Sequence, residues 1–142
     1  MINMMIDDYL ASYRDMLDRI KEREIDCRIM YNQMTKTTAN YDGDGTTGGD
    51  PLDRKREMQA RYADAKQAVA DLKEKAEIRR EEIRVFLEGI PEYRQKRILQ
   101  LYYCDLVDYD KIGEIIGYSR ARVFQLRSEG IKYARELYRH RR

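Results

Sequence analysis

Two arginines and a glutamine follow Ser119 within six residues, and their side chains could make paired hydrogen bonds to nucleic-acid bases. A guanidinium presents parallel N–H donors, which match the O6 and N7 acceptors of guanine in the major groove. A glutamine amide presents one donor and one acceptor, which match the N7 and N6 groups of adenine. On a helix that enters the groove, each such pair discriminates between bases by about 1–3 kcal/mol. The base contacts expected are Arg120, Ala121, Phe124 and Gln125, with Phe124 packing on a thymine methyl group.

The other polar side chains of this stretch are suited to the DNA backbone, where contacts position a protein without reading sequence. From Gly117 to Arg142 the chain has eight Lys or Arg and two Asp or Glu, although the net charge of the whole chain is only +2. A basic end on a slightly acidic body indicates a polyanionic partner. The phosphate contacts expected are Ser119, Arg122, Arg127, Lys132, Arg135 and Arg139.

The basic stretch has a second interpretation that needs no DNA. A charge run is often only a solvated helix surface, and Arg120 and Arg122 would then face water while Phe124 covers the core. In the first interpretation, the end of the chain is a mobile basic segment that adds salt-sensitive affinity for DNA. That segment comprises Arg139, Arg141 and Arg142.

The spacing of small residues between positions 109 and 128 predicts a helix-turn-helix motif. Gly113 would let two helices approach closely, because it has no side chain. Gly117 can take the positive φ angle with which a helix ends. Ser119 can accept a hydrogen bond from a backbone N–H and begin the second helix. Such a motif holds its second helix at an angle suited to the major groove.

The apolar residues around this motif predict the helices that support it. Val123 and Leu126 recur at the spacing of a buried helix face, and the same stripe continues to about Arg139. Gly130 lies inside this helix, where glycine costs roughly 1 kcal/mol against alanine, so we expect close contact with another helix there. A further helix begins at Pro91 and precedes the motif.

Two long amphipathic helices, over about residues 2–37 and 51–88, are predicted from seven-residue repeats of apolar positions. Arg23, Glu24 and Arg79 interrupt the seams, where they could fix the register or simply extend outward to water. The first seam is Ile6, Tyr9, Tyr13, Met16, Ile20, Cys27, Met30 and Met34. The second seam is Met58, Tyr62, Ala65, Val69, Leu72, Ala76, Ile83, Phe86 and Ile90.

The chain therefore divides into two predicted domains of an all-α protein. Residues 1–88 form an antiparallel coiled-coil helical hairpin with a flexible, glycine-rich loop at 38–50. Residues 89–142 form a small three-helix domain with the helix-turn-helix motif. The hairpin could act as a spacer, as a docking surface for a protein, or as the interface of a homodimer.

Composition excludes several classes of protein. The N-terminus carries aspartates where a signal peptide would carry Lys or Arg, and no apolar run approaches membrane-spanning length. We therefore expect a cytoplasmic protein without a membrane partner. Two cysteines and one histidine provide neither a zinc site nor a nucleophile and base, so we expect no enzyme, no cofactor and no metal. Both cysteines should be reduced core residues. Acids in 42–53 approximate a calcium loop, but position 6 of the loop is Thr47 instead of glycine and the last ligand is Asp53.

Residues 91 to about 139 are similar to region 4 of the sigma-70 family of bacterial sigma factors. The runs that carry the resemblance are PEYRQKRILQLYY and DYDKIGEIIGYSRARVFQLRSEGIKYAREL. The whole chain, with its coiled hairpin and a glycine-rich loop ending in Asp-Pro, resembles a family of small sigma-factor-like proteins from phages and prophages. Some members of that family are regarded as late-gene transcription regulators.

The resemblance implies double-stranded DNA and RNA polymerase as partners, because region 4 reads the −35 promoter element and touches the polymerase flap. By position, Arg120, Arg122 and Gln125 are the implied contacts. Ala121 stands where sigma factors often have an acid, and Phe124 where they often have arginine, so we expect a target other than the usual −35 hexamer. The chain resembles no region that melts the −10 element, and we expect it not to act as a complete sigma factor.

The expected function is sequence-specific DNA binding by a phage-type transcription regulator. A second hypothesis is an interaction protein that binds polymerase or another protein without reading DNA. A third is a DNA-recognition component of phage packaging, since such components also combine a helix-turn-helix domain with helical segments that oligomerise. A preferred site with salt-sensitive affinity would separate DNA reading from protein binding.

Overall fold

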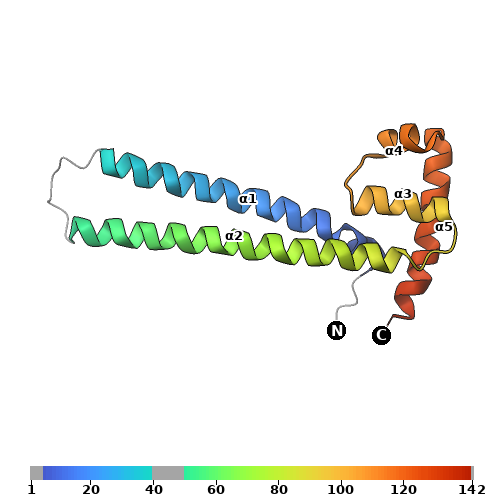
Figure 1. The fold of residues 1–142 in the computed structure, drawn as a ribbon, viewed down its shortest axis with the longest axis horizontal. Helices are drawn as coiled ribbons and strands as arrows, with labels where there is room; N and C mark the ends of the chain where they lie inside the picture. Colours follow the sequence, from blue (N-terminus) through green and yellow to red (C-terminus); the bar gives the residue numbers. More distant parts are fainter. Residues whose placement is uncertain (1–4, 40–49, 142) are drawn as a thin grey trace. The chain divides into compact units, whose positions relative to one another are not determined.

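The computed structural model describes residues 5–39 and 50–141, and all regular structure in these ranges is helical. The predicted all-α class is therefore confirmed (Figure 1). Most of the predicted loop lies outside the described residues, and so do Asp42 and Asp44 of the calcium-like sequence. The helices are α1 (Ile6–Ala39), α2 (Pro51–Leu87), α3 (Tyr93–Tyr103), α4 (Tyr109–Ile116) and α5 (Arg120–Arg139).

The chain divides into two compact units, and each long helix contributes to both. One unit holds residues 1–16 and 76–142, and the other holds residues 17–75. The predicted division into domains of residues 1–88 and 89–142 was based on the order of the elements in the sequence, and it stays a prediction. Within the described ranges, no helix has the length and apolar character needed to cross a membrane.

In the unit of residues 17–75, α1 and α2 run side by side in opposite directions (Figure 1). The rings of Tyr31 and Tyr62 lie 5.8 Å apart, and Glu24 pairs with Lys73 at 3.7 Å. Glu24, a break in the predicted seam, thus joins the two helices, whereas the neighbouring Arg23 is exposed to water. The predicted seam positions Ile20 and Val69 are buried.

In the other unit, aromatic side chains of α1 and α2 meet the C-terminal part of α5. Tyr9 lies 5.5 Å from Phe86 and 5.1 Å from Tyr138, measured between ring centroids. Arg79, the break in the second seam, donates a hydrogen bond of 2.8 Å to the Ser12 hydroxyl. This seam position is therefore a bridge between α1 and α2, not a side chain extended into water.

The start of α3 differs slightly from the prediction. The helix begins at Tyr93 instead of Pro91, because the Glu92 carboxylate accepts hydrogen bonds from the backbone N–H groups of Arg94 and Gln95 and acts as the cap. The far end of α3 is tied to α2, where Arg80 donates to the Cys104 carbonyl at 2.9 Å.

Helices α3, α4 and α5 pack around one small apolar core. Gly130 of α5 lies against α3, where a Cβ atom would meet the Leu99 side chain at 3.0 Å. The close helix contact predicted for this glycine is confirmed. Only the buried side of α5 enters the core, so its opposite side is left to water. The buried core residues are Ile98, Leu101, Ile112, Val123 and Leu126.

Candidate nucleic-acid interface

The turn between α4 and α5 is built by Gly117 and Ser119. Gly117 has φ 83° and ψ 31°, and its N–H donates to the Gly113 carbonyl at 2.8 Å. Ser119 has extended backbone angles, and its hydroxyl accepts from the Arg122 N–H at 3.2 Å. Both predicted roles, the left-handed helix end and the N-terminal cap, are confirmed.

Gly113 has a role close to the predicted one, but its tightest neighbour is the turn. A Cβ atom at this position would lie 2.9 Å from the Tyr118 carbonyl oxygen and 3.7 Å from the Val123 side chain. Glycine is therefore required by the close backbone of the turn, whereas the side chain of the second helix lies at ordinary contact distance. This close approach sets where α5 can begin.

The outward side of α5 carries most of the expected base contacts. Arg120, Ala121 and Gln125 are exposed, and so are Arg122 and Ser128. Arg122 donates to the Gln125 amide oxygen at 2.9 Å, and Arg120 pairs with Asp110 at 3.5 Å. Exposed pairs of this kind contribute only about 0–1 kcal/mol, so these side chains can exchange their partners for DNA at little cost.

Phe124 lies as the second interpretation of the basic stretch predicts, partly over the core, and not on the fully exposed side of α5. It is half-buried against Tyr109 of α4, with ring centroids 4.8 Å apart, and the Arg120 guanidinium lies 5.5 Å from the centroid of the Phe124 ring. Tyr109 in turn stacks on Tyr102 at 4.1 Å. Phe124 is therefore chiefly part of the packing between α4 and α5, because a large aromatic ring beside Val123 finds apolar neighbours there.

Arg127 is also drawn inward from the expected phosphate-binding surface. Its Nε atom donates to the Tyr109 hydroxyl, and its guanidinium lies 5.4 Å from the centroid of that ring. Burial raises the pKa of both Tyr109 and Tyr103, so their hydroxyls stay protonated beside the guanidinium. In this position Arg127 joins α5 to α4 and is less exposed than Lys132 and Arg135 of the same helix.

The remaining expected phosphate contacts lie on the surface of α5. Lys132, Arg135 and Arg139 are exposed, and Arg139 pairs with Glu136 at 3.4 Å. Arg141 of the predicted basic end lies over Tyr9, at 4.8 Å from the ring centroid, and Arg142 lies outside the described residues. The aromatic rings of Tyr9, Phe86 and Tyr138 hold this guanidinium by cation–π attraction, which the sequence pattern gave no reason to expect.

One further cation lies near the turn and was missed by the sequence reasoning. Arg94 of α3 is exposed, and its guanidinium lies 5.5 Å from the centroid of Tyr118, the residue before the Ser119 cap. This contact brings a positive charge from α3 to the residue that leads into α5. No spacing rule connects residues 94 and 118, so only the packing of α3 beside the turn identifies it.

The chemistry available here is hydrogen bonding and charge. No group of three or more His, Cys, Asp or Glu within the described ranges is arranged to hold a metal ion. Burial raises the pKa of the Cys104 thiol to about 11, which keeps it protonated, whereas Cys27 is only half-buried. Comparison with protein-family models, with curated proteins and with solved structures finds no match to this chain.

Proposed function

We propose that this protein is a sequence-specific DNA-binding transcription regulator of phage or prophage type, with α4 and α5 acting as a sigma region 4-like helix-turn-helix. The observation that carries the proposal is the group of exposed hydrogen-bonding side chains at the capped N-terminal end of α5. Arg120, Arg122 and Gln125 lie there, on the side opposite the buried core. A helix with this arrangement can present its first turns to base edges.

The mechanism divides the contacts into reading and positioning. Arg120 and Gln125 read guanine and adenine in the major groove, and Ala121 leaves room for the approach. The phosphate contacts are Ser119, Arg122, Lys132, Arg135 and Arg139. Arg94 adds a phosphate contact beside the turn, because its guanidinium lies near the start of α5.

A rigid recognition helix supports this mechanism, since hydrogen-bond specificity requires donors held in place. The hydrogen bond from Arg127 to Tyr109 and the ring contact of Phe124 with Tyr109 both join α5 to α4. Gly130 allows α3 to lie directly against α5. These contacts fix the direction of the helix that enters the groove.

The two long helices have a separate role in the proposal. We interpret them as an antiparallel coiled-coil hairpin that links the DNA-reading head to a protein partner, either RNA polymerase or a second copy of the chain. A cytoplasmic location of the protein, where DNA and polymerase are accessible, fits this role. A single asymmetric DNA site would indicate a monomer beside polymerase, and a palindrome would indicate a homodimer.

A second candidate function is protein binding without DNA reading, as an interaction protein that contacts RNA polymerase or another protein. Two large apolar side chains of the same small region favour it. Ile115 of α4 is 52% exposed and Tyr93 of α3 is 66% exposed. Apolar groups on a small surface are frequent in protein interfaces, whereas a duplex offers them little apart from thymine methyl groups.

The test begins with selection of bound fragments from random duplex DNA, followed by mobility-shift competition. Arg120→Ala with Gln125→Ala should reduce the ratio of specific to non-specific affinity by about tenfold or more, because each base contact contributes about 1–3 kcal/mol. The control, Lys132→Ala with Arg135→Ala, should weaken binding to all sequences alike. Circular dichroism checks that both variants stay helical. Unchanged discrimination in the first variant, or no selected sequence at all, would refute DNA reading by α5.

A further inference from the structure

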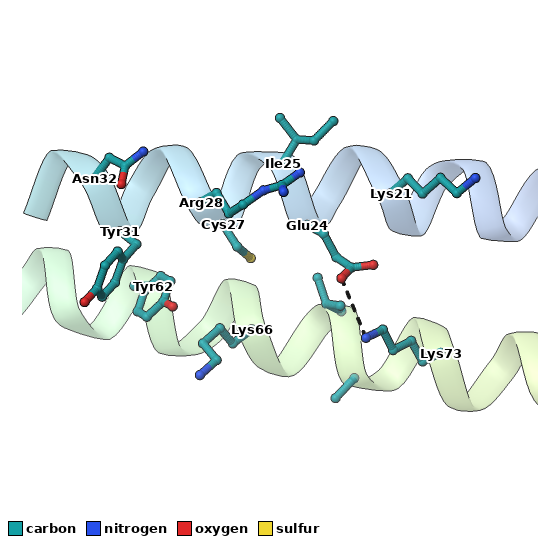
Figure 2. A pocket seen from close by; sticks show the side chains of 12 residues that line it. Lys21, Glu24, Ile25, Cys27, Arg28, Tyr31, Asn32, Tyr62, Lys66 and Lys73 are labelled. Atoms are coloured by element: carbon teal, nitrogen blue, oxygen red, sulfur yellow. Dashed lines mark ion pairs between the residues drawn. The ribbon is translucent and has the colours of Figure 1, made fainter.

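The unit of residues 17–75 contains an open groove between α1 and α2, with a volume of about 840 Å³. Tyr31 of α1 and Tyr62 of α2 face each other at one end, and Glu24 pairs with Lys73 at the other (Figure 2). Between them the side chain of Cys27 points toward α2 (Figure 2). The groove belongs to the unit of residues 17–75, and none of its lining residues is among the proposed DNA contacts.

The groove combines an apolar floor with cationic walls. Its small apolar lining residues, here called the floor, are Cys27, Val69 and Ala70. Val69 is buried, whereas Ala70 is exposed and has no side chain beyond Cβ. Tyr31 and Ile25 add apolar surface at the sides, and they are 51% and 46% exposed. Burial of such exposed apolar groups by a partner is favourable and stabilises the complex.

The charge around this floor is strongly one-sided. Among the described residues that line the groove, Glu24 is the one acid, and it pairs with Lys73 at 3.7 Å. The other three cations leave a net charge of +3 along a segment whose two helices are otherwise of mixed charge. The cations that line the groove are Lys21, Arg28, Lys66 and Lys73.

We propose that this groove binds an acidic, amphipathic helix of a protein partner, with the apolar side of that helix on the floor and its carboxylates against the lysines and arginine. The lining residues extend from Lys21 to Asn32 on α1, which is about 16 Å at 1.5 Å per residue. That length accommodates about three turns of a partner helix. Helix-in-groove recognition uses this combination of apolar anchors and flanking charge.

The apolar floor is the reason for preferring an acidic helix to a nucleic acid. Phosphates would satisfy the cations, but the sugar-phosphate backbone would leave the exposed Ile25, Tyr31 and Ala70 without an apolar partner. Nor does a second copy of the same pair of helices offer a matching surface, because residues 17–39 and 51–75 contain more Lys and Arg than Asp and Glu. An acidic amphipathic helix satisfies both the charge and the floor.

The test uses the full chain and a labelled synthetic peptide of about fifteen residues, with leucine at helical spacing and glutamate beside it. Fluorescence anisotropy should show saturable binding that is lost when lysine replaces the glutamates. Arg28→Glu with Lys66→Glu should weaken binding by about tenfold or more, because attraction becomes repulsion. Ala70→Leu should weaken it as well, since leucine fills the floor while remaining a good helix former.

The matched control is Arg19→Glu with Lys75→Glu, which makes the same change of charge at exposed positions outside the groove and should leave peptide affinity within about twofold. Three results would overturn the proposal. One is equal binding of the acidic and basic peptides. Another is an oligothymidine that binds through Arg28 and Lys66 while the acidic peptide does not. The third is a dimer in sedimentation equilibrium that Ala70→Leu dissociates. Duplex DNA binding by each variant is measured in parallel. A groove variant that loses peptide binding but keeps duplex binding tests the groove independently of the proposed DNA function.

Discussion

Arg127 is half-buried on α5 whereas Arg135 of the same helix is exposed, and substitution of Arg127 tests how α5 is held on α4. Its guanidinium donates to the Tyr109 hydroxyl and lies over the same ring, so it joins α5 to α4. The informative change is Arg127→Met, which keeps an unbranched stem of similar length and removes the charged head. The packing of the stem is thereby largely retained.

The expected loss follows from the contacts that methionine cannot make. A hydrogen bond from a charged donor contributes about 1.5–3 kcal/mol, and a partly exposed cation–π contact about 0.5–1 kcal/mol. Because Arg127 is half-buried, we take the lower part of each range and expect the free energy of unfolding to fall by about 2 kcal/mol. The hydroxyl of Tyr109 would also lose its partner, which adds to the cost.

The assay combines urea denaturation with the salt dependence of duplex binding. For Arg127→Met we expect lower stability and an unchanged slope of log affinity against log salt, because no phosphate contact is removed. The control is Arg135→Met, on the exposed surface of the same helix. It should leave stability within about 0.5 kcal/mol and lower the slope by about 0.9, the value for one phosphate contact.

The reverse pattern would refute this reasoning. If Arg127→Met keeps the full free energy of unfolding and lowers the salt slope by about one contact, the guanidinium binds phosphate in the complex and its bond to Tyr109 contributes little. Equal effects of the two variants on both measurements would also contradict the distinction. The two arginines are close enough in sequence that only the packing separates their roles.

Two further predictions concern the turn and the thiols. Gly117→Ala should lower the free energy of unfolding by about 1–2 kcal/mol in urea denaturation, because an L side chain is strained at a φ of 83°. No atom lies within 4 Å of a Cβ atom at this position, so the loss comes from the backbone and not from a clash. Gly117→Asn should lower the free energy of unfolding less, because asparagine tolerates this conformation better. A thiol reagent at pH 8 should label Cys27 in the folded protein and Cys104 only after unfolding, since burial raises the pKa of Cys104 to about 11. Because the folded state resists ionisation of the Cys104 thiol, the stability contributed by the protonated thiol is complete below the ordinary pKa of 9.0 and is lost as the pH rises toward 11. Cys104→Ala should reduce this loss of stability at alkaline pH. Equal labelling of both thiols in the folded protein would contradict the burial of Cys104.

Local features of the sequence determined the helices and most of their ends. Ser119 caps α5 and Gly117 ends α4 because these roles depend on one side chain or one φ angle and the backbone next to it. The seven-residue repeats likewise identified which sides of α1 and α2 are covered, including Ile20 and Val69, since the period of a helix defines its faces. The outward positions of Arg120 and Gln125 followed from the same periodicity.

The tertiary structure alone decided which partner each side chain meets. Periodicity places Phe124 and Arg127 beside a buried stripe, but only the packing of α4 puts Tyr109 against both of them. Arg141 and Arg94 lie on aromatic rings that are distant in the sequence, which no local rule connects. The cationic groove of residues 17–75 depends in the same way on side chains from two helices that face one side together. Local backbone preferences act over a few residues, whereas these contacts join residues that only the folded chain brings together.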